Sequence, residues 1–167
     1  GMLVGGVVWG FHFVAEWLSH ISANIYIYIA GHLMFLPLLF LGLIALAIIS
    51  ALILKYIPQV GGSGVPYTEG VMRGLLKYKW AKMLFGTIFN SLISFFAGLP
   101  LGIEGPCIQI GGTIGEGVNK LGKPLTKKNN AWLRYSITGA ASAGFAAAFS
   151  APLAGIIFAL EEAQKRL

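Results

Sequence analysis

Long apolar stretches separated by short polar clusters make up most of this sequence. Leu33 to Leu54 contains no charged residue and has about the length that a helix needs to cross a bilayer, roughly 20 residues. Met83 to Ile103 and Tyr135 to Leu160 are similar, although Gly and Pro interrupt both. Met2 to Leu18 is also apolar, but it is short and carries Glu16, so we interpret it as the remnant of a longer helix. The pattern predicts an all-helical protein.

Glycine and proline divide the apolar stretches into helices of unequal length. Residues 61–66 and 98–100 combine these two residue types, and residues 150–152 read SAP; each of the three segments is expected to stop a helix. Irregular backbone at membrane depth is tolerated only where it is buried in protein or lines a cavity, and broken helices of this kind are typical of ion sites in transporters. We expect helices over Leu33–Tyr56, Pro66–Leu76, Trp80–Ala97, Glu104–Leu121, Lys128–Phe149 and Leu153–Lys165.

The composition supports a membrane setting. The chain is 56% hydrophobic and 11% charged, whereas soluble domains contain roughly 25% charged residues. Its net charge of +6 comes from short clusters of cations between the apolar stretches, which is how loop and helix-end cations are distributed in membrane proteins. No basic stripe with interleaved aromatics indicates nucleic-acid binding. We therefore predict an integral, multi-pass protein of the cell membrane, with Lys55 and the cations of 73–82 on the cytoplasmic side.

Candidate enzyme chemistry is missing from the sequence. There is no nucleophile–base pair and no pair of acids placed for hydrolysis, so we expect no enzyme and no cofactor. His12, His20 and His32 do not have the spacing of metal ligands, and we expect no metal site. Cys107 is the single cysteine, which rules out a disulfide within the sequence, and we interpret it as a small apolar filler.

One carboxylate, Glu104, lies within an otherwise uncharged apolar stretch. A charge at membrane depth is costly and usually faces a cavity or an ion path. Pro106 suits the first turn of a helix, and the glycines on either side of Glu104 allow backbone amides to approach a ligand. Because a helix N-terminus attracts anions, this pattern predicts an anion site with a proton-sensitive gate. The alternative is an ordinary acid that stabilises the helix dipole.

Three segments carry a resemblance to a known family. Residues 62–66 read GSGVP and resemble the GSGIP motif of the CLC chloride channels and transporters, with Val for Ile. Residues 102–106 read GIEGP and resemble the GxEGP motif, and residues 139–155 with Glu161 and Glu162 resemble a later signature. The motifs are collinear and cover roughly residues 30 to 167. The resemblance implies a CLC-like bundle of tilted and broken helices.

The resemblance also implies roles for individual residues. Ser63 and Gly64 would bind the central chloride through a hydroxyl and backbone amides, and Gly105 and Ile108 would line the neighbouring helix start. Glu104 would be the gating glutamate, which occupies an anion position when ionised and swings away when protonated. Ser63 has a second interpretation, as an N-cap for the short helix that follows.

At the end of the chain, Glu162 matches the internal proton-transfer glutamate of the exchangers, where channels generally carry a non-acidic residue. Glu161 and Glu162 have a simpler interpretation as the solvated end of the last helix. Ile103 stands where the family often has a basic residue before the gating acid.

The resemblance implies a proton-coupled chloride antiporter, with chloride and protons as its partners. A passive voltage- or pH-gated chloride channel and a non-transporting membrane scaffold are the alternatives. The family is built from two inverted repeats, so residues 1–167 are expected to form a single transmembrane half-domain that pairs with a second-repeat half in the bilayer. A homodimer is expected by resemblance.

Overall fold

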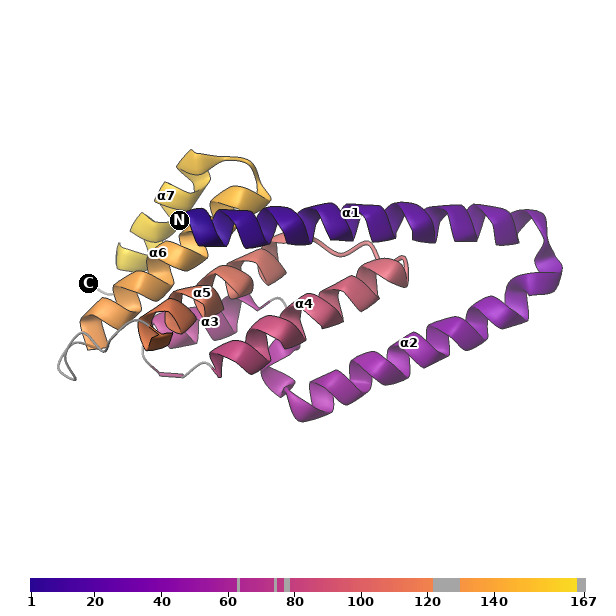
Figure 1. Cartoon of the computed structure of the whole chain (residues 1–167), viewed down its shortest axis with the longest axis horizontal. Coiled ribbons are helices and arrows are strands. Elements are labelled where there is room, and N and C mark those ends of the chain that lie inside the picture. The colour runs from indigo at the N-terminus through magenta and orange to yellow at the C-terminus, as the bar shows by residue number, and fades with distance from the viewer. Residues whose placement is uncertain (63, 74, 77–78, 122–129, 165–167) are drawn as a thin grey trace.

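The computed structural model describes residues 1–62, 64–73, 75–76, 79–121 and 130–164, and every regular element in these ranges is helical. Figure 1 shows two long helices, α1 and α2, that form a hairpin extending from a bundle of shorter helices. The elements are α1 (Met2–Gly31), α2 (Leu36–Tyr56), α3 (Val65–Met72), α4 (Trp80–Phe96), α5 (Glu104–Leu121), α6 (Asn130–Ala148) and α7 (Pro152–Gln164), with 3₁₀ turns at Leu33–Phe35 and Pro58–Val60.

The first helix is longer than the segment expected from the apolar pattern. Instead of ending near Leu18, α1 continues without a break for 30 residues to Gly31. Polar residues beyond Leu18 stop the apolar pattern, but several of them face protein. Ser22 is buried, and the Tyr26 hydroxyl donates a hydrogen bond to the Ala97 carbonyl oxygen at 2.7 Å. The predicted start at Leu33 forms a 3₁₀ turn, and α2 begins at Leu36.

The other predicted boundaries agree with the structure to within a few residues. The exception is α3, which ends at Met72 rather than Leu76 because the chain turns back there. The Leu75 amide donates to the Gly70 carbonyl oxygen at 2.9 Å, which closes that turn. The predicted ends at Lys128 and Lys165 lie outside the described residues.

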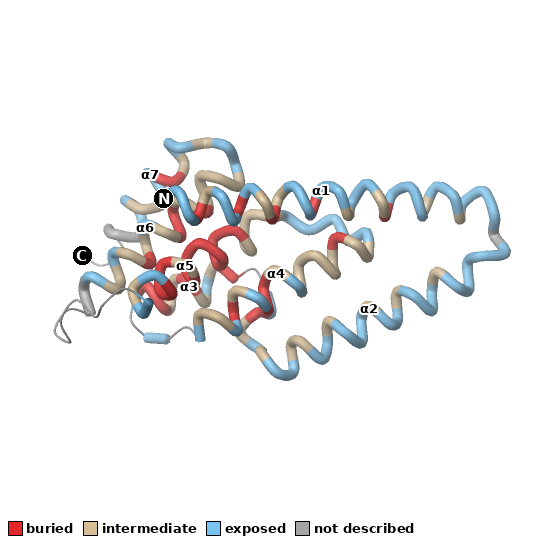
Figure 2. Tube along the Cα trace, in the orientation of Figure 1, coloured by how far each residue is buried: buried red, intermediate tan, exposed pale blue. Residues whose placement is uncertain are grey.

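The long helices carry the apolar surface of the molecule. Among the described helices, α1 and α2 are long and apolar enough to cross a membrane. None of the α2 residues is buried, and Figure 2 shows exposed positions along most of the hairpin. An apolar groove of about 560 Å³ lies between α2 and α4, lined in part by Leu52, Tyr56 and Phe85. Apolar surface of this extent is unusual on a monomeric soluble protein and suits contact with lipid or another apolar partner.

The buried core is centred on α5 and α6, which approach closely through small residues. A Cβ on Gly111 would overlap the Ala140 carbonyl oxygen, and a Cβ on Gly144 would overlap the Cys107 carbonyl oxygen. The Ala- and Gly-rich helix α6 thus packs closely on α5, because small residues let helix backbones meet. Cys107 is fully buried in the same interface, as an apolar filler would be.

The α5–α6 crossing makes a direct prediction about stability. Gly144→Ala places a methyl group against fixed backbone, so we expect it to lower the free energy of unfolding by about 1–3 kcal/mol. Gly139→Ala is the matched control on the same helix, because a Cβ there meets nothing within 4 Å. That change is expected to be neutral or to stabilise by up to about 1 kcal/mol, since Ala favours helix over Gly. Thermal unfolding in detergent measures the stability of both variants. Equal unfolding temperatures for the two would contradict the close packing of α5 on α6.

Candidate functional site

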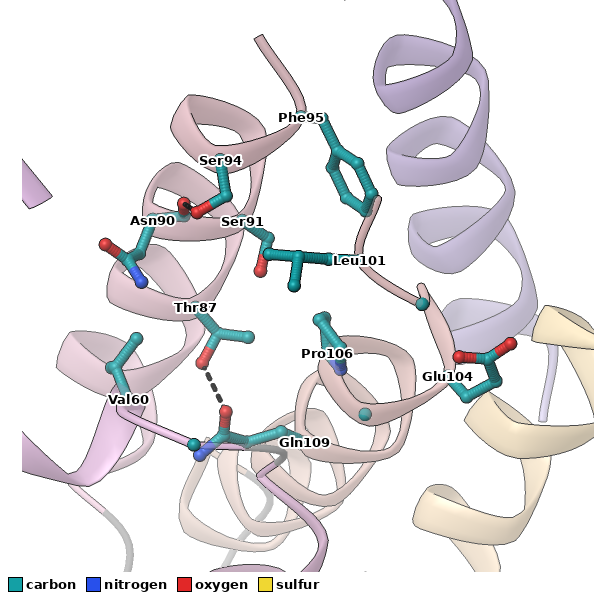
Figure 3. Close-up of a pocket in the computed structure, with 13 residues that line it drawn as sticks. Val60, Thr87, Asn90, Ser91, Ser94, Phe95, Leu101, Glu104, Pro106 and Gln109 are labelled. Atoms are coloured by element: carbon teal, nitrogen blue, oxygen red, sulfur yellow. Dashed lines mark hydrogen bonds between the residues drawn. The ribbon is translucent and has the colours of Figure 1, made fainter. Parts of the chain in front are cut away.

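Two segments that are far apart in the sequence meet at one cavity of about 350 Å³. Gly62, just before α3, and Glu104 with Gly105, at the start of α5, line the same space. The remaining lining comes mainly from α4 and from the loop that precedes α5 (Figure 3). The two motif segments therefore come together, as a shared ion site requires.

A buried glutamine joins these segments. Gln109 on α5 is 1% exposed, and its side-chain nitrogen donates to the Gln59 carbonyl oxygen at 3.0 Å. The Thr87 hydroxyl of α4 donates to the Gln109 side-chain oxygen at 2.9 Å, as the dashed line in Figure 3 marks. Gln109 thus fixes the chain before α3 and the wall formed by α4 to the first turns of α5. Sequence reasoning missed this residue, although an amide among apolar residues five positions after Glu104 was a visible signal.

Gly64 sets the geometry at the start of α3. Its φ of 73° lies in the left-handed region, which residues with a side chain adopt at a cost. Its carbonyl oxygen accepts hydrogen bonds from the Thr68 amide at 3.1 Å and the Thr68 hydroxyl at 2.9 Å. A Cβ on Gly64 would lie 3.0 Å from the Gln109 side-chain oxygen. The close approach of this loop to α5 therefore depends on glycine.

Glu104 is the first residue of α5, as predicted, and its side chain is half-buried. The carboxylate rests so close to Gly102 that a Cβ on that residue would overlap it. Figure 3 shows the carboxylate pointing away from Thr87 and Asn90, toward the opposite side of the α5 start. At a helix N-terminus the unpaired amides favour negative charge, so this position suits either the carboxylate itself or a bound anion.

Uncharged polar groups on α4 complete the wall of the cavity. Asn90, Ser91 and Ser94 line it beside Thr87. The Ser50 hydroxyl of α2 donates to the Asn90 side-chain oxygen at 2.7 Å, and the Ser94 hydroxyl donates to the Asn90 carbonyl oxygen at 2.9 Å. These residues were expected only as part of an apolar helix. Apart from Glu104, the described lining of this cavity is uncharged, so it presents dipoles to a ligand.

The remaining predicted site residues lie in the apolar core or outside the described part of the structure. The Ile108 side chain is buried in an apolar cluster with residues of α3, α4 and α6, and it does not line the cavity. Ser63 lies outside the described residues. Glu162 belongs to the last helix, α7, but its side chain is also outside the described part of the structure.

Comparison with known proteins agrees with the family resemblance of the sequence motifs. The sequence profile of the family described as voltage gated chloride channel matches residues 45–167. The H(+)/Cl(-) exchange transporter ClcA of Salmonella arizonae and that of Salmonella newport are each 36% identical to this chain over 166 residues. The match covers 97% of this chain and 34% of each relative, so the chain spans about a third of their length. Because the profile covers most of its residues, the chain belongs to the voltage gated chloride channel family.

Proposed function

We propose that this chain forms part of a chloride pathway through a membrane and that chloride movement is coupled to protons. The observation that carries the proposal is the single cavity shared by Gly62 and by the α5 start at Glu104. The relatives that are named as exchange transporters for protons and chloride support it. The apolar exteriors of α1 and α2 support a multi-pass position in the cell membrane.

Chloride binding would use dipoles rather than a full positive charge. Conduction requires that an ion bind weakly enough to leave again, and amide and hydroxyl dipoles at helix starts meet this requirement. We assign the chloride ligands to Ser63 and the backbone at Gly64, Gly105 and Ile108. The Gln109 hydrogen bonds to Gln59 and Thr87 support this assignment, because they hold the chain before α3 and the middle of α4 against the first turns of α5.

Glu104 would couple the two ions through one side chain. An ionised carboxylate competes with chloride for the helix N-terminus, whereas a protonated one does not. A bound chloride also repels the ionised carboxylate and favours its protonation. Chloride and proton occupancy at this position are therefore linked, which is the requirement for exchange.

The other part of the pathway would come from a second repeat, supplied elsewhere in the same protein or by a separate chain. Support comes from the relatives, which are about three times as long as the segment that they share with this chain. A homodimer of the complete transporter remains part of the proposal. In this arrangement Glu162 passes protons between the inner solution and Glu104.

Flux measurements in liposomes test the proposal through Glu162. Glu162→Gln is expected to reduce proton uptake by at least tenfold, because the loss of a proton-transfer group typically costs roughly 10²-fold. Chloride efflux should continue in this variant. Glu161→Gln is the matched control at the neighbouring position and should keep coupling. Wild-type chloride efflux with no proton uptake would favour a channel. No flux of either ion from folded, complete transporter would favour the scaffold alternative.

A further inference from the structure

A stripe of titratable residues runs along the apolar helix α1. His12, Glu16 and His20 are spaced four residues apart, so they share one face of the helix. The His12 Nδ1 atom lies 3.4 Å from a Glu16 carboxylate oxygen. Within membrane helices such residues are rare and face the protein interior or water, where chains of Asp, Glu and His form proton relays. The chloride site described above does not use this stripe.

Two cavities lie along this face of α1. The first, of about 420 Å³, is lined by His12, Glu16 and His20 together with Ile103, the residue before Glu104. The second, of about 440 Å³, continues past Ser22 and Tyr26 to the loop between α4 and α5. Ser19 and Phe95 line both cavities. Phe95 also lines the cavity shared by Gly62 and Glu104, which we call the chloride-site cavity. All three cavities therefore border the Phe95 side chain.

A buried hydroxyl provides a position at the second cavity where water would bind. Ser22 is 2% exposed, and its hydroxyl oxygen has no hydrogen-bond partner among the described residues. A buried polar group that lacks a protein partner normally binds an ordered water. The cavity it lines is far larger than one water molecule, which takes about 30 Å³ of liquid volume. Water there would connect Ser22 with the hydroxyl of Ser19.

The titratable groups that line this route come from α1, whereas Glu104 lines neither of the two cavities and borders the neighbouring one. In the described lining of the two cavities, α4 contributes Phe95 and the loop before α5 contributes uncharged residues. Tyr26 lines the second cavity, and its hydroxyl donates a hydrogen bond to the Ala97 carbonyl oxygen. Glu104 follows directly on Ile103, and its carboxylate points away from the α4 polar groups, to the side where the α1 ribbon runs in Figure 3.

We propose that the α1 stripe of His12, Glu16 and His20, together with water in the two cavities, is a proton relay that serves Glu104. The inference rests on the proposed function of Glu104 as a proton-carrying gate. In each step a protonated imidazole, carboxyl or water gives one proton to the next acceptor, and the donor is reprotonated by the group behind it. Each group therefore returns to its starting charge after one proton has passed.

The relay is tested by measuring proton uptake and chloride efflux together in liposomes containing the complete transporter. We expect Glu16→Gln, and separately the double variant His12→Gln/His20→Gln, to slow proton uptake at least tenfold, because a positioned proton-transfer group typically contributes about 10²-fold or more. Chloride efflux should stay within about twofold of wild type, because the stripe does not line the chloride-site cavity. Glu16→Asp keeps the titratable group and should restore proton uptake, with a shifted pH profile.

His32→Gln is the matched control, since His32 ends the same helix outside both cavities and is exposed. Normal proton uptake in both stripe variants, while Glu104→Gln still abolishes it, would overturn the relay and leave the proposed function intact. Equal loss of both fluxes that Glu16→Asp does not rescue would also overturn it, because that is a structural effect. If wild type moves chloride without protons, the proposed antiport and the relay both fail.

Discussion

Glu104→Gln is expected to abolish proton uptake while chloride still moves, at a rate that no longer depends on pH. Glutamine has nearly the shape of a protonated glutamate, but it neither carries negative charge nor releases a proton. It therefore cannot compete with chloride at the α5 N-terminus, and it cannot pass protons onward. Chloride efflux and proton uptake, recorded over a range of pH in the same liposomes, measure both effects.

Glu161→Gln provides the control for charge removal, because Glu161 is exposed on α7 and is assigned no role in the pathway. It should retain proton uptake and the wild-type dependence of chloride efflux on pH. If Glu104→Gln still takes up protons at the wild-type rate, the gate assignment is wrong. A loss of chloride efflux in well-folded Glu104→Gln protein would mean that chloride movement itself requires the carboxylate, which is not the role of the proposed gate.

Gly64→Val is expected to remove most chloride transport. The φ of 73° at this residue is costly for a residue with a Cβ, by about 1–2 kcal/mol, and more so for a branched side chain. The new Cβ would also press on the Gln109 side-chain oxygen, 3.0 Å away. Either the α3 start moves or Gln109 gives up its bonds to Gln59 and Thr87. Both outcomes displace the proposed chloride ligands, so efflux should fall by at least tenfold.

Gly62→Ala separates backbone strain from the contact with Gln109. Gly62 also has a left-handed φ, 83°, but a Cβ there meets nothing within 4 Å. It should cost stability of a similar order, about 1–2 kcal/mol, while most chloride efflux remains. Chloride efflux and thermal unfolding are measured on both variants. Wild-type efflux in Gly64→Val would contradict the position assigned to the α3 start.

Features with a local physical cause were predictable from the sequence. The start of α5 at Glu104 and the stop after Trp80–Phe96 follow from glycine and proline, which act on their immediate neighbours. The position of Glu104 at a helix start beside a cavity was predictable for the same reason, since its charge and the helix start lie within a few residues. The close packing of α5 on α6 also has a local cause, because small residues on both helices let their backbones meet.

Features that depend on distant contacts were not predictable in this way. Gln109 acts through Gln59, 50 residues away in the sequence, and nothing near it indicates that partner. The length of α1 was not predicted because the apolar pattern weakens after Leu18, whereas Ser22 and Tyr26 face the loop after α4. The surroundings of the Ile108 side chain were not predictable from its place in a motif, because its core neighbours come from α3, α4 and α6.

Proton movement driven by a chloride gradient tests the central claim most directly. Liposomes containing the complete transporter are loaded with high chloride and diluted into low-chloride medium, with the membrane potential held near zero by a potassium ionophore. As chloride leaves, coupled exchange must bring protons inward, so we predict that the external pH rises although no proton gradient was imposed. Chloride efflux with an unchanged external pH would contradict proton-coupled exchange by this protein.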